Sequence, residues 1–246
     1  MPKPQGFGRA VRSAPVRIAL VGATGLLGRK MISLSSASDI VRIVGLARRE
    51  VELPQGARIE MFVAQTPWWG EVLDGVRPQA LICALGTTWA KAGRSEERFR
   101  EVDYDLIVNT AKQARAAQVP NLVLISAAGA DPRAKMLYLK VKGETEAELS
   151  SLGFKRLDIL RPGLLKGARE DDWRPLEFAA KLVSPLAEPL LPEHMAKFRT
   201  IDADVVSQAA LQLSMRKAAG RYTHDNDAMM RAAREWRARV DGHPVG

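Results

Sequence analysis

A tyrosine and a lysine, Tyr138 and Lys142, stand four residues apart at the start of a segment with helical spacing. Residues four apart lie on the same face of a helix. A free phenol has a pKa of about 10, too high for ready proton exchange at neutral pH. A neighbouring cation favours the phenolate. The two side chains are therefore either an acid–base group with the cation that tunes it, or two ordinary surface residues.

A serine precedes this pair in the sequence. Ser126 ends a run of apolar residues, 121–126, that is typical of a buried strand. Ligands of parallel α/β sheets bind outside the carboxyl ends of the strands. We therefore predict that Ser126 lies in the same crevice as the start of the helix that carries Tyr138 and Lys142.

A glycine turn, VGATGLLG at residues 21–28, leads from a predicted strand into a predicted helix. In such a turn one glycine permits the tight bend, the next lets the backbone approach a pyrophosphate, and the third lets the helix pack closely. We favour dinucleotide binding over a merely structural turn. The residues predicted to contact the cofactor here are Gly22, Thr24, Gly25, Leu26, Leu27 and Gly28.

Two arginines, Arg48 and Arg49, close the second predicted strand, where an acid would favour NAD and arginine accommodates a 2′-phosphate. Because Glu50 follows at once, the pattern favours NADP(H) and leaves NAD(H) open, and the arginines could also be merely solvated. Gly86 ends the fourth predicted strand, next to the first strand at the crevice. We therefore predict that Gly86 and Thr87 also contact the cofactor.

Apolar runs and helical patterns alternate along the chain, which predicts an α/β fold. The expected strands are 16–22, 39–47, 57–64, 79–86, 121–126 and 156–163, and the helices between them include 25–37, 95–118 and 138–152. We predict a Rossmann-type doubly wound parallel sheet with helices on both faces. Further helices at 173–190, 203–218 and 226–240 predict a small C-terminal helical cap. The expected organisation is a flexible basic tail, 1–15, and one NAD(P)-binding Rossmann domain, 16–240, with its cap at about 170–240.

The glycine turn with Ser126, Tyr138 and Lys142 resembles the short-chain dehydrogenase/reductase family over residues 16–165. Within it, four motifs are similar to atypical, epimerase-like members, in particular the Tat-interacting oxidoreductase-like proteins. These motifs are LGTTWAKAG (85–93), SAAGAD (126–131), LYLKVKGETEA (137–147) and LRPGLL (160–165).

The resemblance implies a role for each site residue. Tyr138 would protonate a carbonyl oxygen as hydride arrives, or take that proton in reverse, and Ser126 would orient the oxygen. Lys142 would hold the nicotinamide ribose, and Pro162 and Gly163 would border the nicotinamide. The implied activity is NADP(H)-dependent oxidation or reduction of an unknown alcohol or carbonyl compound. The alternatives are a non-catalytic NADPH-binding regulatory or interaction protein and a nucleotide-sugar epimerase or dehydratase.

The sequence departs from the family at one position of the long helix. Many active members carry an asparagine there, and this chain carries Asp103 in the segment EVDYD. A proton relay through this helix is therefore not expected.

Composition narrows the class of protein. The 246 residues carry a net charge of +9, but basic residues are dispersed among acids, which favours a solvated surface over a nucleic-acid face. The single cysteine, Cys83, predicts a reducing compartment, and we expect a cytoplasmic protein.

The acid-free N-terminus could be a transit peptide but better fits a loose tail. No apolar stretch approaches membrane-spanning length, and the histidines lack metal-ligand spacing. The expected partner is a small-molecule substrate, and the oligomeric state, a homodimer included, stays open.

Overall fold

A single parallel sheet organises the computed structural model, which describes residues 14–166 and 198–242. Its strand order is β3-β2-β1-β4-β5-β6-β9, and every neighbouring pair is parallel. This confirms the predicted Rossmann-type sheet and adds one strand to it. The strands are β1 Val16–Val21, β2 Val41–Ala47, β3 Glu60–Val63, β4 Ala80–Cys83, β5 Asn121–Ile125, β6 Arg156–Leu160 and β9 Gly220–His224.

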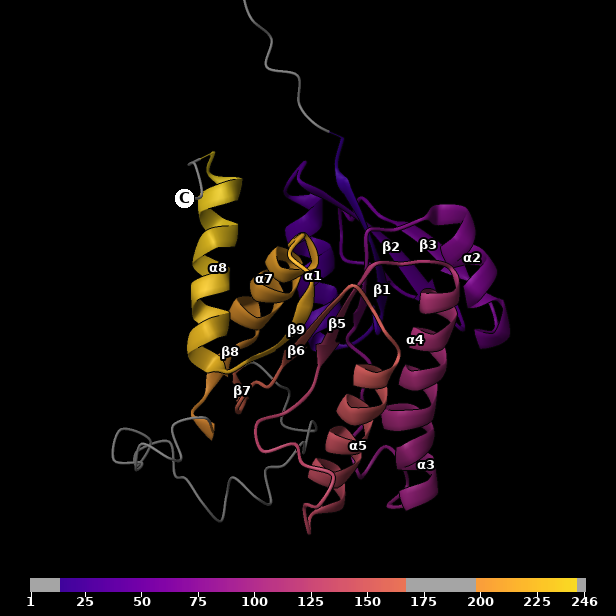
Figure 1. Cartoon of the computed structure of the whole chain (residues 1–246). Coiled ribbons are helices and arrows are strands. Elements are labelled where there is room, and N and C mark those ends of the chain that lie inside the picture. Colours follow the sequence, from indigo (N-terminus) through magenta and orange to yellow (C-terminus); the bar gives the residue numbers. More distant parts are fainter. Residues whose placement is uncertain (1–13, 167–197, 243–246) are drawn as a thin grey trace, which may run out of the picture.

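Helices cover both faces of the sheet (Figure 1). One face carries α1 Leu26–Ser36, α7 Ala203–Ser214 and α8 Asn226–Val240; the other carries α2 Trp69–Val76, α4 Leu106–Ala116 and α5 Leu137–Ser151. Side chains of a strand alternate between faces. In β1, Ile18 and Leu20 pack into the first core, whereas Ala19 and Val21 pack into the second. The apolar β1 is therefore buried on both sides, as a doubly wound sheet requires.

The long helix expected at 95–118 is interrupted. It consists of α3 Glu96–Arg100, a π-helical turn at Glu101–Asp105, and α4. The Ser95 hydroxyl accepts a hydrogen bond from the Arg98 amide and caps α3. π-helical turns often occur at functional sites. This one carries Asp103, whose side chain is completely buried.

The C-terminal part of the chain differs from the expected arrangement. α7 packs against α1 and α8 packs against α7 on one face of the sheet, where Trp236 and Val206 join the core, and neither helix lies above the carboxyl edge of the sheet (Figure 1). The helix predicted at 173–190 lies outside the described residues. The strand β9 was not predicted, because it is short, polar and mostly exposed at the sheet edge.

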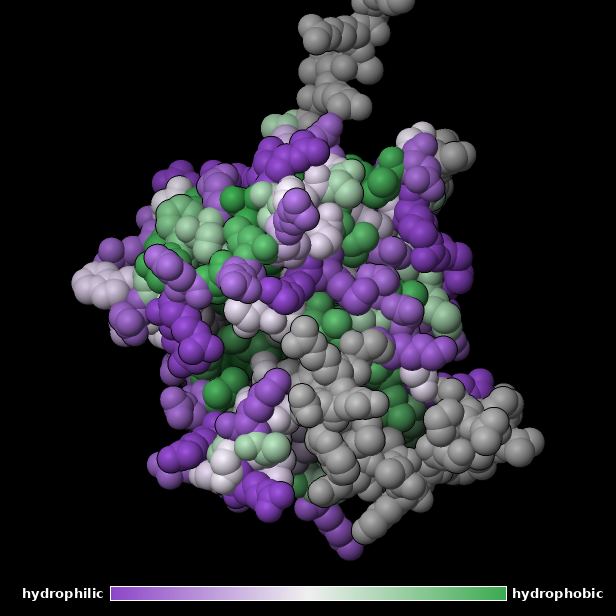
Figure 2. Space-filling view, turned by 180° about the vertical axis from the view of Figure 1, so that it is seen from behind, coloured by the Kyte–Doolittle hydropathy of each residue, from purple (hydrophilic) through white to green (hydrophobic). Residues whose placement is uncertain are grey.

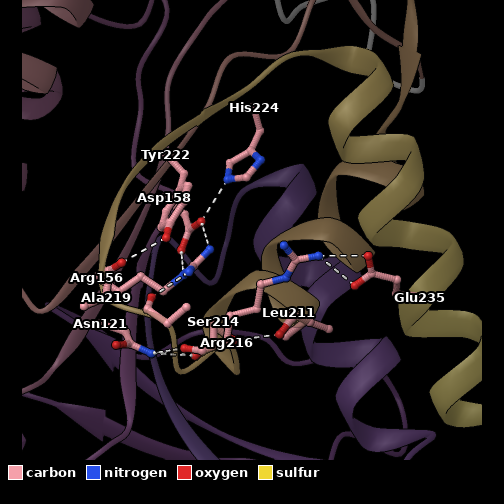
Figure 3. A network of polar contacts seen from close by, with 11 residues as sticks. Asn121, Arg156, Asp158, Leu211, Ser214, Arg216, Ala219, Tyr222, His224 and Glu235 are labelled. Atoms are coloured by element: carbon pink, nitrogen blue, oxygen red, sulfur yellow. Dashed lines mark hydrogen bonds and ion pairs between the residues drawn. The ribbon is translucent and has the colours of Figure 1, made fainter. Parts of the chain in front are cut away.

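A buried polar network attaches β9 to β6 (Figure 3). Arg156 donates two hydrogen bonds of 2.6 and 2.7 Å to Asp158, and the His224 ring nitrogen Nε2 lies 2.8 Å from the same carboxylate. The Arg156 guanidinium also lies 4.1 Å from the centre of the Tyr222 ring. A buried guanidinium needs such partners, so side chains from both strands fix the position of the edge strand.

On the face shown in Figure 2, hydrophilic side chains form much of the surface, and hydrophobic side chains lie between them. Within residues 14–166 and 198–242, no helix combines the length and the apolar character that crossing a bilayer requires.

Candidate active site

The candidate site lies where the strand order reverses, between β1 and β4. The turn after β1 runs against the chain that follows β4, and the Ala84 amide donates to the Val21 carbonyl at 2.9 Å. Gly22 has a φ of +92°, and a Cβ atom at this residue would lie 2.5 Å from the Ala84 carbonyl. Only glycine fits here, because both the backbone conformation and the close contact exclude a side chain.

The second and third glycines of the turn have different surroundings. A Cβ atom on Gly28 would lie 2.2 Å from the Gly22 carbonyl oxygen, so Gly28 permits α1 to pack against the turn. A Cβ atom on Gly25 would meet nothing closer than the same oxygen, at 3.4 Å. The protein's own packing therefore does not require glycine at position 25. Gly25 is the N-cap residue of α1, whose first turn contains no acidic residue.

The other predicted turn residues divide by exposure. Thr24 is exposed and Leu26 is half-buried, whereas Leu27 belongs to the hydrophobic core. Leu27 can therefore contact a ligand only through its backbone. Arg48 and Arg49 are both exposed directly after β2. A third arginine, Arg29, is exposed on α1 and donates to the Glu52 carbonyl at 3.2 Å, which ties α1 to the loop after β2.

A buried ion pair connects two of the predicted site residues. The Lys142 ammonium lies 2.9 Å from the Asp103 carboxylate, and both side chains are at most 5% exposed. The other carboxylate oxygen accepts a hydrogen bond of 2.7 Å from the backbone amide of Thr87. The structure thus brings Thr87 and Lys142 together through Asp103, a contact that the sequence analysis did not predict.

The positive charge of Lys142 also acts on Cys83, the last residue of β4. Burial raises the pKa of the Cys83 thiol to about 12, and the positive charge of Lys142 acts in the opposite direction. Cys83 is completely buried and behaves as a small hydrophobic side chain, as predicted.

Ser126 lies at the end of β5 and is almost completely buried. Its amide donates to the Leu160 carbonyl at 2.8 Å, which extends the β5–β6 pairing into the crevice. Its hydroxyl donates to the carboxylate of Glu146, which stands one helical turn after Lys142. Arg161 holds that carboxylate in turn, through Nε contacts of 3.0 and 3.2 Å and a further contact from a terminal nitrogen. The hydrogen bonds that Arg161 donates to Glu146 raise the pKa of its guanidinium above the usual value.

Tyr138 begins α5 and is half-buried. Its ring packs 6.0 Å, centre to centre, from Phe99, which in turn contacts Trp89 at 6.3 Å. These contacts fix the ring and do not use the phenol oxygen. α5 itself lies close to the loop before it, because a Cβ atom on Gly143 would lie 2.3 Å from the Asp131 carbonyl carbon.

The segment after β6 is held by Asn226 at the start of α8. The Gly163 amide donates to the Asn226 side-chain oxygen at 3.0 Å, and the Asn226 side-chain nitrogen donates to the Arg199 carbonyl at 2.8 Å. A Cβ atom on Gly163 would lie 2.1 Å from that carbonyl oxygen, so the close contact requires glycine. Pro162 is buried, and its carbonyl accepts from the Ala128 amide at 2.9 Å.

The sequence analysis missed Glu146 and Arg161, although both lie in the quoted motifs. One signal was available: Glu146 follows Lys142 by four residues and so lies on a neighbouring part of the same helical face. Their partners could not be read from the sequence. Among the described residues, no group of three or more His, Cys, Asp or Glu side chains could hold a metal ion.

Comparison with known proteins identifies relatives. Residues 73–191 match the family model HIM1. The protein fmp52, mitochondrial, of Emericella nidulans is 34% identical over 213 residues, which are 82% of this chain and 89% of the relative. Among solved structures, the UDP-glucose 4-epimerase of Thermus thermophilus in complex with NAD has a TM-score of 0.61 at 18% identity, covering 93% of this chain and 84% of the epimerase. The UDP-Glc/GlcNAc 4-epimerase of Campylobacter jejuni has a TM-score of 0.63 at 13% identity, covering 88% of this chain and 82% of the epimerase.

The fold is therefore that of the NAD-binding, epimerase-like short-chain dehydrogenase/reductases. The chain belongs to the FMP52 family. These likenesses support the broader resemblance, while the finer one, to the Tat-interacting proteins, rests on the sequence motifs alone. The expectation of a cytoplasmic protein is wrong, because the FMP52 relatives are named as mitochondrial.

Proposed function

We propose that this protein is an NADP(H)-dependent oxidoreductase that acts on a small carbonyl or alcohol substrate. The observation that carries the proposal is the glycine turn, in which Gly22 and Gly28 are required by packing and Gly25 is not. Gly25 is the N-cap residue of α1, and backbone amides and the helix dipole attract a pyrophosphate at such a helix N-terminus. The names of the relatives favour a mitochondrial location.

The chemistry of the site follows from three side chains. The bound nicotinamide supplies or accepts the hydride. Tyr138, in the first turn of α5, gives a proton to the substrate oxygen or takes it back, and Lys142, four residues later on the same helix, binds the nicotinamide ribose. Ser126, at the end of β5, orients the substrate oxygen. The expected turnover therefore interconverts a carbonyl group and an alcohol.

Cofactor choice depends on the loop after β2. Arg48 and Arg49 are exposed there, and Arg29 is tied to the same loop through Glu52. A guanidinium matches a phosphate group in shape and charge. These contacts support a preference for the 2′-phosphate of NADP(H) over the 2′-hydroxyl of NAD(H).

Titration of the purified protein with NADPH and NADH, followed by nicotinamide fluorescence, tests this preference. We expect NADPH to bind more tightly, and we expect the variant Arg48→Ala/Arg49→Ala to lose about 10- to 100-fold in NADPH affinity, because bonds to charged groups contribute about 1.5–3 kcal/mol. Its NADH affinity should change little. Equal binding of the two cofactors by the wild type would contradict the preference, and binding of neither would contradict the proposed function.

Gly25→Val tests the pyrophosphate position. A Cβ atom fits at this position, and the valine side chain would stand beside the helix N-terminus, so we expect a folded protein with at least about 100-fold weaker NADPH binding, the loss of several phosphate hydrogen bonds. Gly75→Val is the matched control. Gly75 lies in α2, and a Cβ atom there meets nothing within 4 Å. Unchanged NADPH affinity in Gly25→Val would place the phosphates elsewhere.

One observation favours a second candidate function, a non-catalytic NADPH-binding regulatory protein. The Ser126 hydroxyl already donates its proton to Glu146, so it is not directed at a substrate oxygen. In such a protein NADPH would bind with the same preference, but screening of aldehydes and ketones would show no turnover that depends on Tyr138.

A further inference from the structure

The buried ion pair of Asp103 and Lys142 belongs to a contact that connects three segments of the chain. Asp103 is fully buried on the π-helical turn, and its carboxylate contacts a different segment at each oxygen. One oxygen meets the Lys142 ammonium of α5 at 2.9 Å. The other accepts from the Thr87 amide, in the chain after β4, at 2.7 Å. A single side chain therefore joins the cofactor crevice to the helix of the proposed acid–base pair.

The backbone of the same residue has a separate partner. The Thr145 hydroxyl lies 2.8 Å from the Asp103 carbonyl oxygen and at the same distance from the Val141 carbonyl oxygen of its own helix. Thr145 is completely buried. The backbone carbonyl at position 103 is thus engaged from within α5. A substitution of the side chain at position 103 leaves this backbone contact in place.

Burial makes the position of the ammonium depend on Asp103. A charged group out of water is stable only with a partner, and removal of one member of a buried pair leaves the other uncompensated. Lys142 lies on α5 and its charge is felt at Cys83, at the carboxyl end of β4. The carboxylate therefore keeps the ammonium beside the switch point between β1 and β4, where the cofactor would lie.

We propose that Asp103 is a positioning residue for the cofactor: it holds Lys142 where the nicotinamide ribose arrives, while its second oxygen fixes the loop at Thr87. This inference rests on the proposed function, because it assigns to Asp103 an effect on cofactor affinity that is transmitted by Lys142. In this role Asp103 acts through Lys142 and needs no contact of its own with the cofactor.

A double-mutant cycle with NADPH as the probe tests the inference. Asparagine at position 103 has nearly the shape of aspartate and still offers an oxygen to the Thr87 amide, but it does not attract the ammonium. We expect Asp103→Asn and Lys142→Met each to weaken NADPH binding by about 10-fold, and the double variant to bind like Lys142→Met within about twofold. The measurement is nicotinamide fluorescence at fixed salt concentration, on protein shown to be folded by circular dichroism.

Asp105→Asn is the matched control. It makes the same change of charge on the same π-helical turn, but Asp105 is exposed, so we expect NADPH affinity within about twofold of the wild type. If Asp103→Asn does not fold, the double variant still allows the test, since it leaves no buried charge unpaired. Its affinity is then compared with that of Lys142→Met alone.

Three results would overturn the inference while the wild type binds NADPH. One is wild-type affinity in Asp103→Asn. Another is a double variant about 10-fold weaker than Lys142→Met, which would show that Asp103 acts independently of the lysine. The third is an Asp105→Asn variant that loses as much NADPH affinity as Asp103→Asn, which would show that the change in net charge alone causes the loss. A wild-type protein that binds neither NADPH nor NADH contradicts the proposed function itself.

Discussion

Replacing Tyr138 with phenylalanine is expected to lower carbonyl reduction by NADPH about 10²- to 10⁴-fold, the usual contribution of a positioned acid–base group. The ring should stay in place, because its contact with Phe99 at 6.0 Å does not involve the phenol oxygen. NADPH affinity should therefore remain within about twofold of the wild type, and thermal unfolding should change little. The measurement is NADPH consumption with the best substrate from a screen of aldehydes and ketones.

Tyr104→Phe is the control for this variant. Tyr104 packs against the same hydrophobic cluster as Tyr138, formed by Ala92, Phe99 and Val141, and the substitution likewise removes a phenol hydroxyl group. We expect the control to keep its turnover. Full activity in Tyr138→Phe would show that Tyr138 is not the proton donor.

Removing the carboxylate of Asp158 is expected to destabilise the fold strongly. Asp158 lies in β6, and its side chain is fully buried between Arg156 and His224 (Figure 3). Asp158→Ala leaves the buried Arg156 guanidinium without its ionic partner, which typically costs about 3–5 kcal/mol. We expect the free energy of unfolding, measured by urea titration, to fall by that amount.

An ion pair nearby provides the comparison. Glu235 of α8 pairs with Arg216 at 2.8 Å, and their side chains are 32% and 39% exposed. Because water screens a pair of this kind, Glu235→Ala should cost no more than about 1 kcal/mol. If the two variants were equally stable, the network at Asp158 would not be what fixes β9 to the sheet.

The fold was predicted correctly where the sequence pattern depends on interactions between residues close together in the chain. β1 is apolar from Ile18 to Val21 because both of its faces are buried there, and VGATGLLG combines a tight turn with a close helix start. The interruption of the long helix at Glu101–Asp105 could not be predicted. Its residues have ordinary helical spacing, and the turn is accommodated by contacts from α5, far along the chain. β9 was missed for a related reason, since its polar residues become strand only by pairing with β6.

In the candidate site, too, the sequence predicted some features, and only the tertiary structure revealed the others. The spacing of Gly22, Gly25 and Gly28 was sufficient to predict a strand–turn–helix, and that of Tyr138 and Lys142 a shared helix, because backbone conformation and helix geometry act over a few residues. The dinucleotide site and the acid–base pair stay predictions. Tertiary structure alone decided which carboxylate each polar side chain meets. Asp103 reaches Lys142 across 39 positions and Glu146 reaches Ser126 across 20, and such contacts depend on how helices and strands pack, which short-range patterns do not encode.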